Sequence, residues 1–149
     1  FSGSTINTPS MICVEDFLDV LNWSKEIGGL EELIKRSKDN LNVIKDWVFS
    51  SDWVDFLCED LNNLSNTSIC LKLTDPKLIS QSLETKNIIE KNIINLLEEN
   101  NVAFDIGSYR SAPPGLRIWG GPTVENDDIK KLLPWLDWAY HKSLSDLDI

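Results

Sequence analysis

Apolar residues recur at two different spacings along this chain, and the order of those spacings limits the folds that it can adopt. Residues 10–27 and 30–48 carry apolar side chains every three or four positions, the spacing that lines one side of an α-helix. Residues 68–73 instead alternate, with every second side chain apolar, as in a half-buried β-strand. The chain must therefore combine helices with a sheet.

Turn residues divide the rest of the sequence into short segments. Strands are expected at 53–58, 68–73, 102–106 and 116–119, and further helices at 84–100 and from 125 onward. The predicted order is helix, helix, strand, strand, helix, strand, strand, helix. This order predicts an α+β fold, with helices packed on one face of a small, mainly antiparallel sheet.

Length and charge restrict the class of protein. A chain of 149 residues is long enough for one domain with its own hydrophobic core. The net charge of −10 disfavours nucleic acid and anionic membranes as partners. No apolar run reaches the length of a membrane span, so we expect a cytoplasmic protein. The chain opens without methionine, and we expect it to be an internal part of a longer protein.

The residue types that usually carry metal or nucleophilic chemistry are scarce. Cys13, Cys58 and Cys70 are odd in number and have apolar neighbours, so we expect buried free thiols in a reducing compartment. His141, the single histidine, falls on the polar side of the last helix and is expected at the surface. We therefore expect neither a metal site nor a histidine-dependent nucleophile.

Tryptophan is abundant, and most of the six tryptophans fall within apolar patterns. A surface that stacks nucleic-acid bases is disfavoured by the acidic charge, so we expect five of them in the core. These are Trp23, Trp47, Trp53, Trp135 and Trp138. Arg36 lies on the polar side of the second helix, where we expect it to be solvated.

The other two arginines, Arg110 and Arg117, flank a loop stiffened by Pro113 and Pro114. In the strand that follows, Arg117 and Trp119 share the face opposite to the apolar residues. An arginine in so apolar a strand needs an anion, which is either an internal carboxylate or a ligand. Its planar guanidinium suits a carboxylate held by two parallel hydrogen bonds. Both possibilities remain open at this point.

Small hydroxyl and amide side chains occupy residues 4–10, directly before the first helix. Ser10 is placed to cap that helix. Backbone N–H groups at a helix N-terminus, together with such side chains, can also hold a phosphate. The segment is therefore either a capping turn or a phosphate site.

Four segments resemble the phosphoserine aminotransferases, and they occur in the right order along the chain. The segments are 4–11, 66–72, 112–119 and 133–139. The resemblance implies a fold type I aminotransferase with a large cofactor domain and a small carboxyl-terminal domain. Residues 1–9 would then be a loop of the large cofactor domain, and residues 10–149 the small domain.

The same resemblance implies a function. The family exchanges an amino group between glutamate and 3-phosphohydroxypyruvate in serine biosynthesis, with a related substrate in pyridoxal phosphate biosynthesis. It uses pyridoxal 5'-phosphate and forms homodimers. By position, Asn7 and Thr8 would contact the cofactor phosphate of the partner subunit. Arg117 would hold the substrate α-carboxylate, and Arg110 would bind the phosphate end. Tyr109 stands where other members of the family have histidine.

The family's catalytic lysine, which forms a Schiff base with the cofactor, lies upstream of the segment that 4–11 resembles. None of the lysines here matches its motif, so no catalytic residue is expected in this chain, and we expect the chain alone to be inactive. Two alternatives remain. One is a non-catalytic module that binds a small anion through Arg110 and Arg117. The other is a different fold type I aminotransferase.

Overall fold

The chain divides into two units, Phe1–Lys35 and Arg36–Ile149, and the computed structural model describes residues 5–149. The first unit contains α1 (Met11–Glu26) and the start of α2 (Gly29–Ser50). The second contains the rest of α2, the sheet and the two remaining helices. The predicted division into a loop at 1–9 and a domain at 10–149 stays a prediction.

The first unit has the helix limits that the sequence predicts. The Ser10 side chain accepts a hydrogen bond from the Cys13 N–H at 3.5 Å and caps α1. Gly28 and Gly29 have φ angles of 117° and 74°, which residues with a side chain rarely adopt, and they separate α1 from α2. No residue of α1 is buried, although its sequence is rich in apolar side chains.

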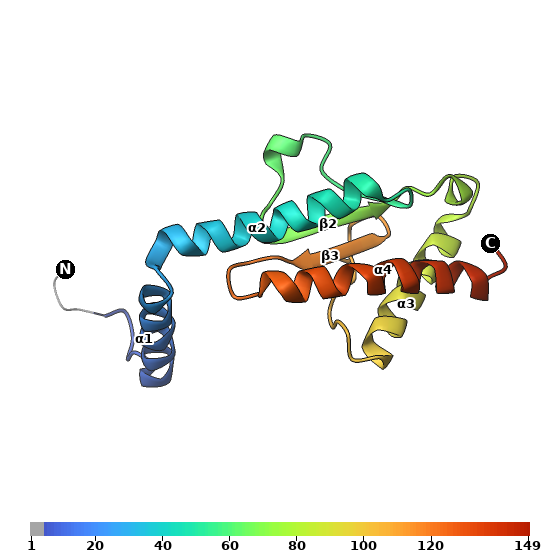
Figure 1. Cartoon of the computed structure of the whole chain (residues 1–149). Helices are drawn as coiled ribbons and strands as arrows, with labels where there is room; N and C mark the ends of the chain where they lie inside the picture. The colour runs from blue at the N-terminus through green and yellow to red at the C-terminus, as the bar shows by residue number, and fades with distance from the viewer. Residues whose placement is uncertain (1–4) are drawn as a thin grey trace. The chain divides into compact units, whose positions relative to one another are not determined.

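A three-stranded sheet lies at the centre of the second unit (Figure 1). It consists of β1 (Val54–Phe56), β2 (Ser68–Leu73) and β3 (Gly115–Trp119), in the order β1-β2-β3, and both pairings are antiparallel. Short 3-10 turns at Leu61–Asn63 and Pro76–Leu78 flank β2. The alternation predicted for 68–73 is confirmed in β2, where Ile69 and Leu71 are buried.

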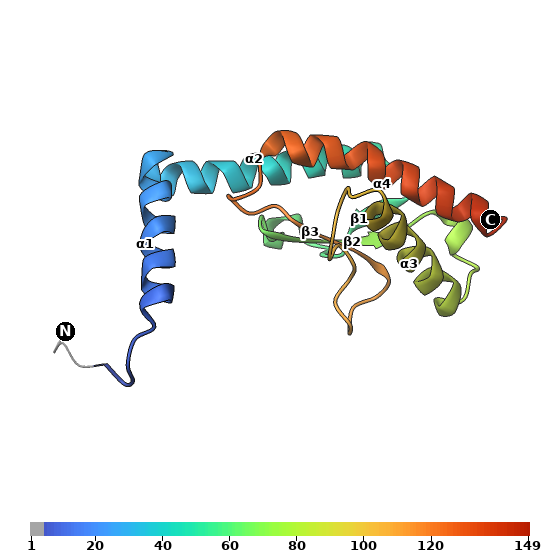
Figure 2. The ribbon, with the colours of Figure 1, turned by 90° about the horizontal axis from the view of Figure 1, so that it is seen from below.

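Helices cover one face of this sheet. Figure 2 shows α2 and α4 (Asn126–Asp146) above it, and α3 (Leu83–Glu99) packs against α4. The apolar side chains of the strands point toward the helices and form the core. Among them, Phe56, Ile69, Leu71, Leu116 and Ile118 are at most 3% exposed. The predicted α+β arrangement is confirmed.

Polar atoms within the covered layer are paired. The Trp53 and Tyr140 rings stack with their centroids 4.1 Å apart. The indole N–H groups of Trp47 and Trp53 both donate to the Asp137 carboxylate, at 3.1 and 2.9 Å. The Tyr140 hydroxyl donates to Asp75 at 2.7 Å; burial, followed by this bond, raises the pKa of Tyr140. The core positions predicted for Trp47 and Trp53 are confirmed.

The strand predicted at 102–106 does not form. Asn101 and Asp105 have φ angles of 55° and 52°, in the left-handed region, which interrupts an extended strand. Among the described residues, one isolated antiparallel bridge, between Gly107 and Leu116, pairs the end of this segment with β3. In addition, the Arg117 N–H donates to the Ile106 carbonyl at 2.8 Å. The segment runs beside β3 as an irregular loop.

Several burial predictions were wrong. Trp135 and Trp138 are 39% and 40% exposed, because they lie on the outer side of α4 and pack edge-to-face against each other. Cys13 is exposed, whereas Cys58 and Cys70 are half-buried; all three are free thiols, but none is fully buried. The burial of these residues is set by tertiary contacts, and it cannot be predicted from apolar neighbours in the sequence.

Arg36 is not simply solvated, contrary to the prediction. Its Nε donates to the Pro122 carbonyl at 2.7 Å, and its Nη2 pairs with Glu125. One turn further along α2, Asn40 is fully buried and donates to carbonyls between β3 and α4, with Val124 at 3.0 Å. These polar side chains fix the connection between β3 and α4 to α2. His141 is exposed, as predicted.

Candidate anion-binding site

The face of the sheet opposite to the helices carries the polar and aromatic side chains of β2 and β3. The register places Cys70 opposite Arg117 and Ser68 opposite Trp119. Since successive residues of a strand point to opposite faces, these four side chains share one face. They are half-buried or exposed, unlike their neighbours in sequence. The predicted facing of Arg117 with Trp119 is confirmed.

Arg117 is held mainly by one loop segment. Its Nη2 donates to the backbone carbonyl of Asp105 at 3.1 Å and to the Asp105 carboxylate at 3.0 Å. Its Nε makes a weaker contact of 3.5 Å with the Gly107 carbonyl. The side chain of Arg117 is 24% exposed and that of Asp105 is 91% exposed. Hydrogen bonding to Asp105 raises the pKa of Arg117.

The sequence left open whether Arg117 binds an internal carboxylate or a ligand. Within the chain, its partner is the carboxylate of Asp105. Ion pairs with so exposed a carboxylate contribute at most about 1 kcal/mol. Such a pair leaves the guanidinium available to a ligand carboxylate that replaces the Asp105 side chain.

Tyr109 covers the guanidinium of Arg117. The Cζ atom of Arg117 lies 4.5 Å from the centre of the Tyr109 ring, a cation–π contact. The Tyr109 hydroxyl lies 3.4 Å from the Ser68 Oγ on β2. This hydroxyl contact, together with the bonding and charge of Arg117, lowers the pKa of Tyr109. Tyr109 thus links the loop to two strands.

The loop before β3 is anchored from α3. The Glu90 carboxylate accepts hydrogen bonds from the N–H of Ser108 at 2.9 Å and from its Oγ at 2.6 Å. Arg110, two residues further on, is exposed and has no hydrogen bond or ion pair with residues 5–149. The structure therefore brings Tyr109 and Arg117 together and leaves the guanidinium of Arg110 free within the described part of the chain.

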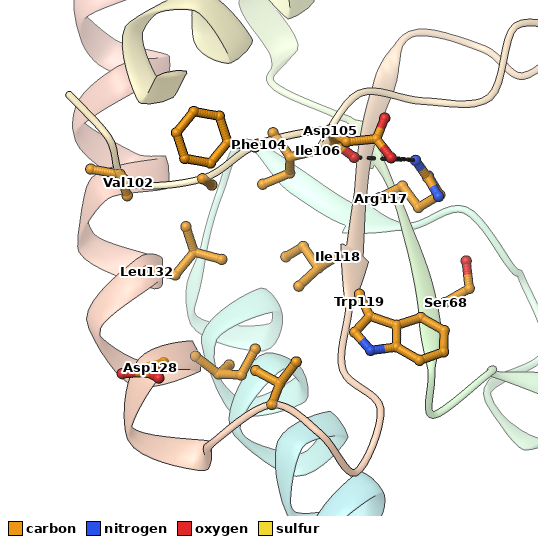
Figure 3. A pocket seen from close by; sticks show the side chains of 13 residues that line it. Ser68, Val102, Phe104, Asp105, Ile106, Arg117, Ile118, Trp119, Asp128 and Leu132 are labelled. Carbon is orange, nitrogen blue, oxygen red and sulfur yellow. Dashed lines mark hydrogen bonds and ion pairs between the residues drawn. The ribbon is translucent and has the colours of Figure 1, made fainter. Parts of the chain in front are cut away.

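A cavity of about 320 Å³ opens beside Arg117, where the loop 102–106 runs along the edge of β3 (Figure 3). Figure 3 shows Arg117 joined to Asp105 on one side, and Ile118 and Leu132 on another. Most of its lining is apolar, and its charged groups are Arg117, Asp105 and Asp128. The one cation of the cavity already pairs with Asp105, so a small organic anion could bind there only in place of the Asp105 carboxylate.

Asn7 and Thr8 lie in the first unit, just before α1. Both are exposed, and the Thr8 N–H donates to the Asn7 Oδ1 at 2.8 Å. Within residues 5–149, the Asn7 amide N–H groups and the Thr8 hydroxyl have no hydrogen-bond acceptor. Ser10 acts as the cap, so the capping reading is confirmed for Ser10.

Some residues of this site were missed by sequence reasoning. Asp105 was assigned to a strand interior, although an aspartate four residues after an Asn-Asn pair is compatible with a turn. Ser68 could have been found from the alternation of β2, which places it on the polar face. Glu90 gave no local signal, because its partner Ser108 is 18 residues away.

Neither a metal-binding group nor a membrane-spanning helix occurs in residues 5–149. Residues 5–149 include no group of three or more histidine, cysteine or acidic side chains that could hold a metal ion. Within the same residues, no helix combines the length and the hydropathy needed to cross a membrane.

Relatives of this chain are found among aminotransferases. It is 48% identical over 143 residues to a phosphoserine aminotransferase of Methanosarcina barkeri, covering 95% of this chain and 35% of that protein. It is 46% identical over 142 residues to that of Methanosarcina mazei, covering 94% and 35%. A putative phosphoserine aminotransferase of Mycobacterium avium is 24% identical over 143 residues, covering 93% and 34%. No family model matches the chain.

Solved structures share the fold. The phosphoserine aminotransferase of Bacillus circulans subsp. alkalophilus superimposes with a TM-score of 0.72 at 23% identity, over 91% of this chain and 34% of that one. A phosphoserine aminotransferase studied for radiation damage of its Schiff base gives 0.73 at 19% identity, over 91% and 34%. The fold is thus one that aminotransferases contain.

The sequence likeness is more specific than the fold. This chain is related to the phosphoserine aminotransferases, and it spans about a third of the length of the curated relatives that it matches.

Proposed function

We propose that the chain is the carboxyl-terminal small domain of a phosphoserine aminotransferase. The full-length protein would transfer an amino group between glutamate and 3-phosphohydroxypyruvate, in serine and pyridoxal phosphate biosynthesis. The proposal rests on the position of Arg117: its guanidinium lies at the open face of the sheet, beside a partly apolar cavity. The 48% identity to a phosphoserine aminotransferase supports the same reaction.

Arg117 is assigned to the substrate α-carboxylate. Both substrates carry a carboxylate next to the reacting carbon, so one arginine serves both halves of the reaction. A bidentate pair fixes the orientation of that carbon as well as binding it. Arg110, exposed and without a partner in residues 5–149, is assigned to the phosphate end of the substrate.

Pyridoxal 5'-phosphate, when bound, supplies the electron sink for amino transfer. The donors of Asn7 and Thr8 fit its phosphate, because the Asn7 Oδ1 is used by the Thr8 N–H and the amide N–H groups have no acceptor within residues 5–149. We assign them to the cofactor of the partner subunit in a homodimer. The catalytic lysine is expected in sequence outside this chain. The homodimer and the cytoplasmic location remain predictions.

The direct test is an assay of the full-length protein with glutamate and 3-phosphohydroxypyruvate. We expect production of 2-oxoglutarate and phosphoserine. Turnover with another keto acid, and none with 3-phosphohydroxypyruvate, would assign the protein to a different fold type I aminotransferase. If no keto acid is turned over but the protein still binds an anion, the protein is instead a non-catalytic anion-binding module.

Substitution of the arginines tests their separate roles. Arg117→Ala should lower kcat/KM for both substrates roughly 10²-fold, since a charge-assisted bidentate pair is worth on the order of 3 kcal/mol. Arg110→Ala should raise KM more for 3-phosphohydroxypyruvate than for glutamate. Lys91→Ala, which removes an exposed cation of α3 outside this cavity, is the matched control. A loss below threefold for Arg117→Ala contradicts its role.

The cofactor assignment has its own readout. Asn7→Ala should weaken retention of the cofactor, measured as the absorbance that remains after dialysis of the full-length protein. Ser10→Ala removes the cap of α1 and controls for general loosening of this turn. Unchanged cofactor affinity in Asn7→Ala would reduce Asn7 to a turn residue.

A further inference from the structure

The hydrogen bonds of Arg117 use only part of its guanidinium. Nε and one N–H of Nη2 are directed at backbone carbonyls, those of Gly107 and Asp105. The second N–H of Nη2 goes to the Asp105 carboxylate. No carbonyl or carboxylate oxygen among the described residues accepts from Nη1. The edge formed by Nη1 and Nη2 is therefore the place where a carboxylate could bind in bidentate fashion.

The guanidinium of the same residue lies over the Tyr109 ring, with Cζ 4.5 Å from the ring centre. The ring is itself fixed at two points. Its hydroxyl lies 3.4 Å from the Ser68 Oγ on β2. Its backbone follows Ser108, which Glu90 holds through two hydrogen bonds. Tyr109 is 52% exposed, so its side chain contributes little to the hydrophobic core.

We propose that Tyr109 is a positioning residue: its ring holds the plane of the Arg117 guanidinium so that the Nη1–Nη2 edge faces the carboxylate of the substrate. The backbone carbonyls fix the inner edge, the ring fixes one face, and the Asp105 carboxylate occupies the outer edge until a ligand replaces it. This inference rests on the proposed role of Arg117. It gives Tyr109 a role through its face, which phenylalanine shares and an aliphatic side chain lacks.

The test uses steady-state kinetics of the full-length protein with glutamate and 3-phosphohydroxypyruvate. Tyr109→Leu should raise KM for both substrates about two- to fivefold, with kcat little changed, which corresponds to an exposed cation–π contact of about 0.5–1 kcal/mol. Tyr109→Phe retains the ring and should restore most of the affinity. Trp135→Leu, an exposed aromatic of α4 that lies outside this site, is the matched control and should change neither KM.

A double substitution separates positioning from other effects. In an Arg117→Ala background, Tyr109→Leu should have no further effect on KM, because the group that it positions is gone. An equal increase in both backgrounds would overturn the inference, as would a Tyr109→Phe variant as impaired as Tyr109→Leu. Unchanged KM values in Tyr109→Leu, where Arg117→Ala alone is strongly impaired, would overturn it while leaving the proposed function intact. A silent Arg117→Ala variant would instead overturn the proposed function, and the inference with it.

Discussion

The two faces of the three-stranded sheet are built from alternate residues of the same strands, yet they differ in chemistry. On the covered face, Ile69 and Ile118 are 1% and 3% exposed. On the open face, the side chain of Arg117 is 24% exposed and Trp119 is 56% exposed. Neighbours in one strand thus support the core on one side and remain accessible on the other. Substitutions one residue apart should therefore separate stability from ligand binding.

A pair of tryptophans gives the largest expected difference. Trp53→Ala removes a ring that is 1% exposed, stacks on Tyr140 and donates to Asp137. The free energy of unfolding should fall by about 3–5 kcal/mol, as for other buried aromatics. Trp119→Ala should change it by about 0.5 kcal/mol or less, because Trp119 is 56% exposed.

Urea unfolding of the 149-residue chain, followed by far-ultraviolet circular dichroism, measures both variants. Far-ultraviolet detection is preferred because each substitution removes a tryptophan and changes the fluorescence. Equal losses of stability in Trp53→Ala and Trp119→Ala would break the comparison, since the open face would then be part of the core.

The buried amide of Asn40 tests the same difference between the two faces, because a polar group in the covered layer is tolerated only when it is hydrogen-bonded. Asn40→Ala removes the donor to the carbonyls of Gly120 and Val124 and should cost about 1–3 kcal/mol. Asn95→Ala, at an exposed position of α3, is the control and should stay within about 0.5 kcal/mol. If the two variants were equally stable, Asn40 would not fix the connection between β3 and α4.

Local periodicity explains what the sequence could predict. The limits of α1, with Ser10 as its cap, depend on residues three or four apart, and so does the alternation of β2. The facing of Arg117 with Trp119 follows from the same alternation. A pattern of this kind needs no knowledge of distant partners, which is why the fold class was confirmed.

Long-range partners explain what it could not predict. Arg36 and Asn40 bind groups that lie 80 to 89 residues away, so a helical pattern alone cannot reveal their contacts. The segment 102–106 looks like a strand by composition, but a left-handed Asp105 interrupts it. That same residue is the internal partner of Arg117, and only the three-dimensional structure shows it.

The smallest expected effect lies on the open face, at Asp105. Its carboxylate holds the outer edge of Arg117, and at 91% exposure the ion pair contributes little to stability. Asp105→Asn removes the charge and keeps a side chain that tolerates the left-handed backbone there. The free energy of unfolding should therefore change by about 0.5 kcal/mol or less.

Binding should change in the opposite direction from every other substitution in this site. With a neutral side chain at position 105, a substrate carboxylate competes against a weaker acceptor, so KM of the full-length protein for both substrates should fall about twofold. Asp128→Asn, which neutralises the other acidic residue of the cavity, is the control for a general change of charge, because Asp128 pairs with Lys131 and not with Arg117. If Asp105→Asn raises KM, then Asp105 orients Arg117 for the ligand, and its carboxylate does not compete for the same edge.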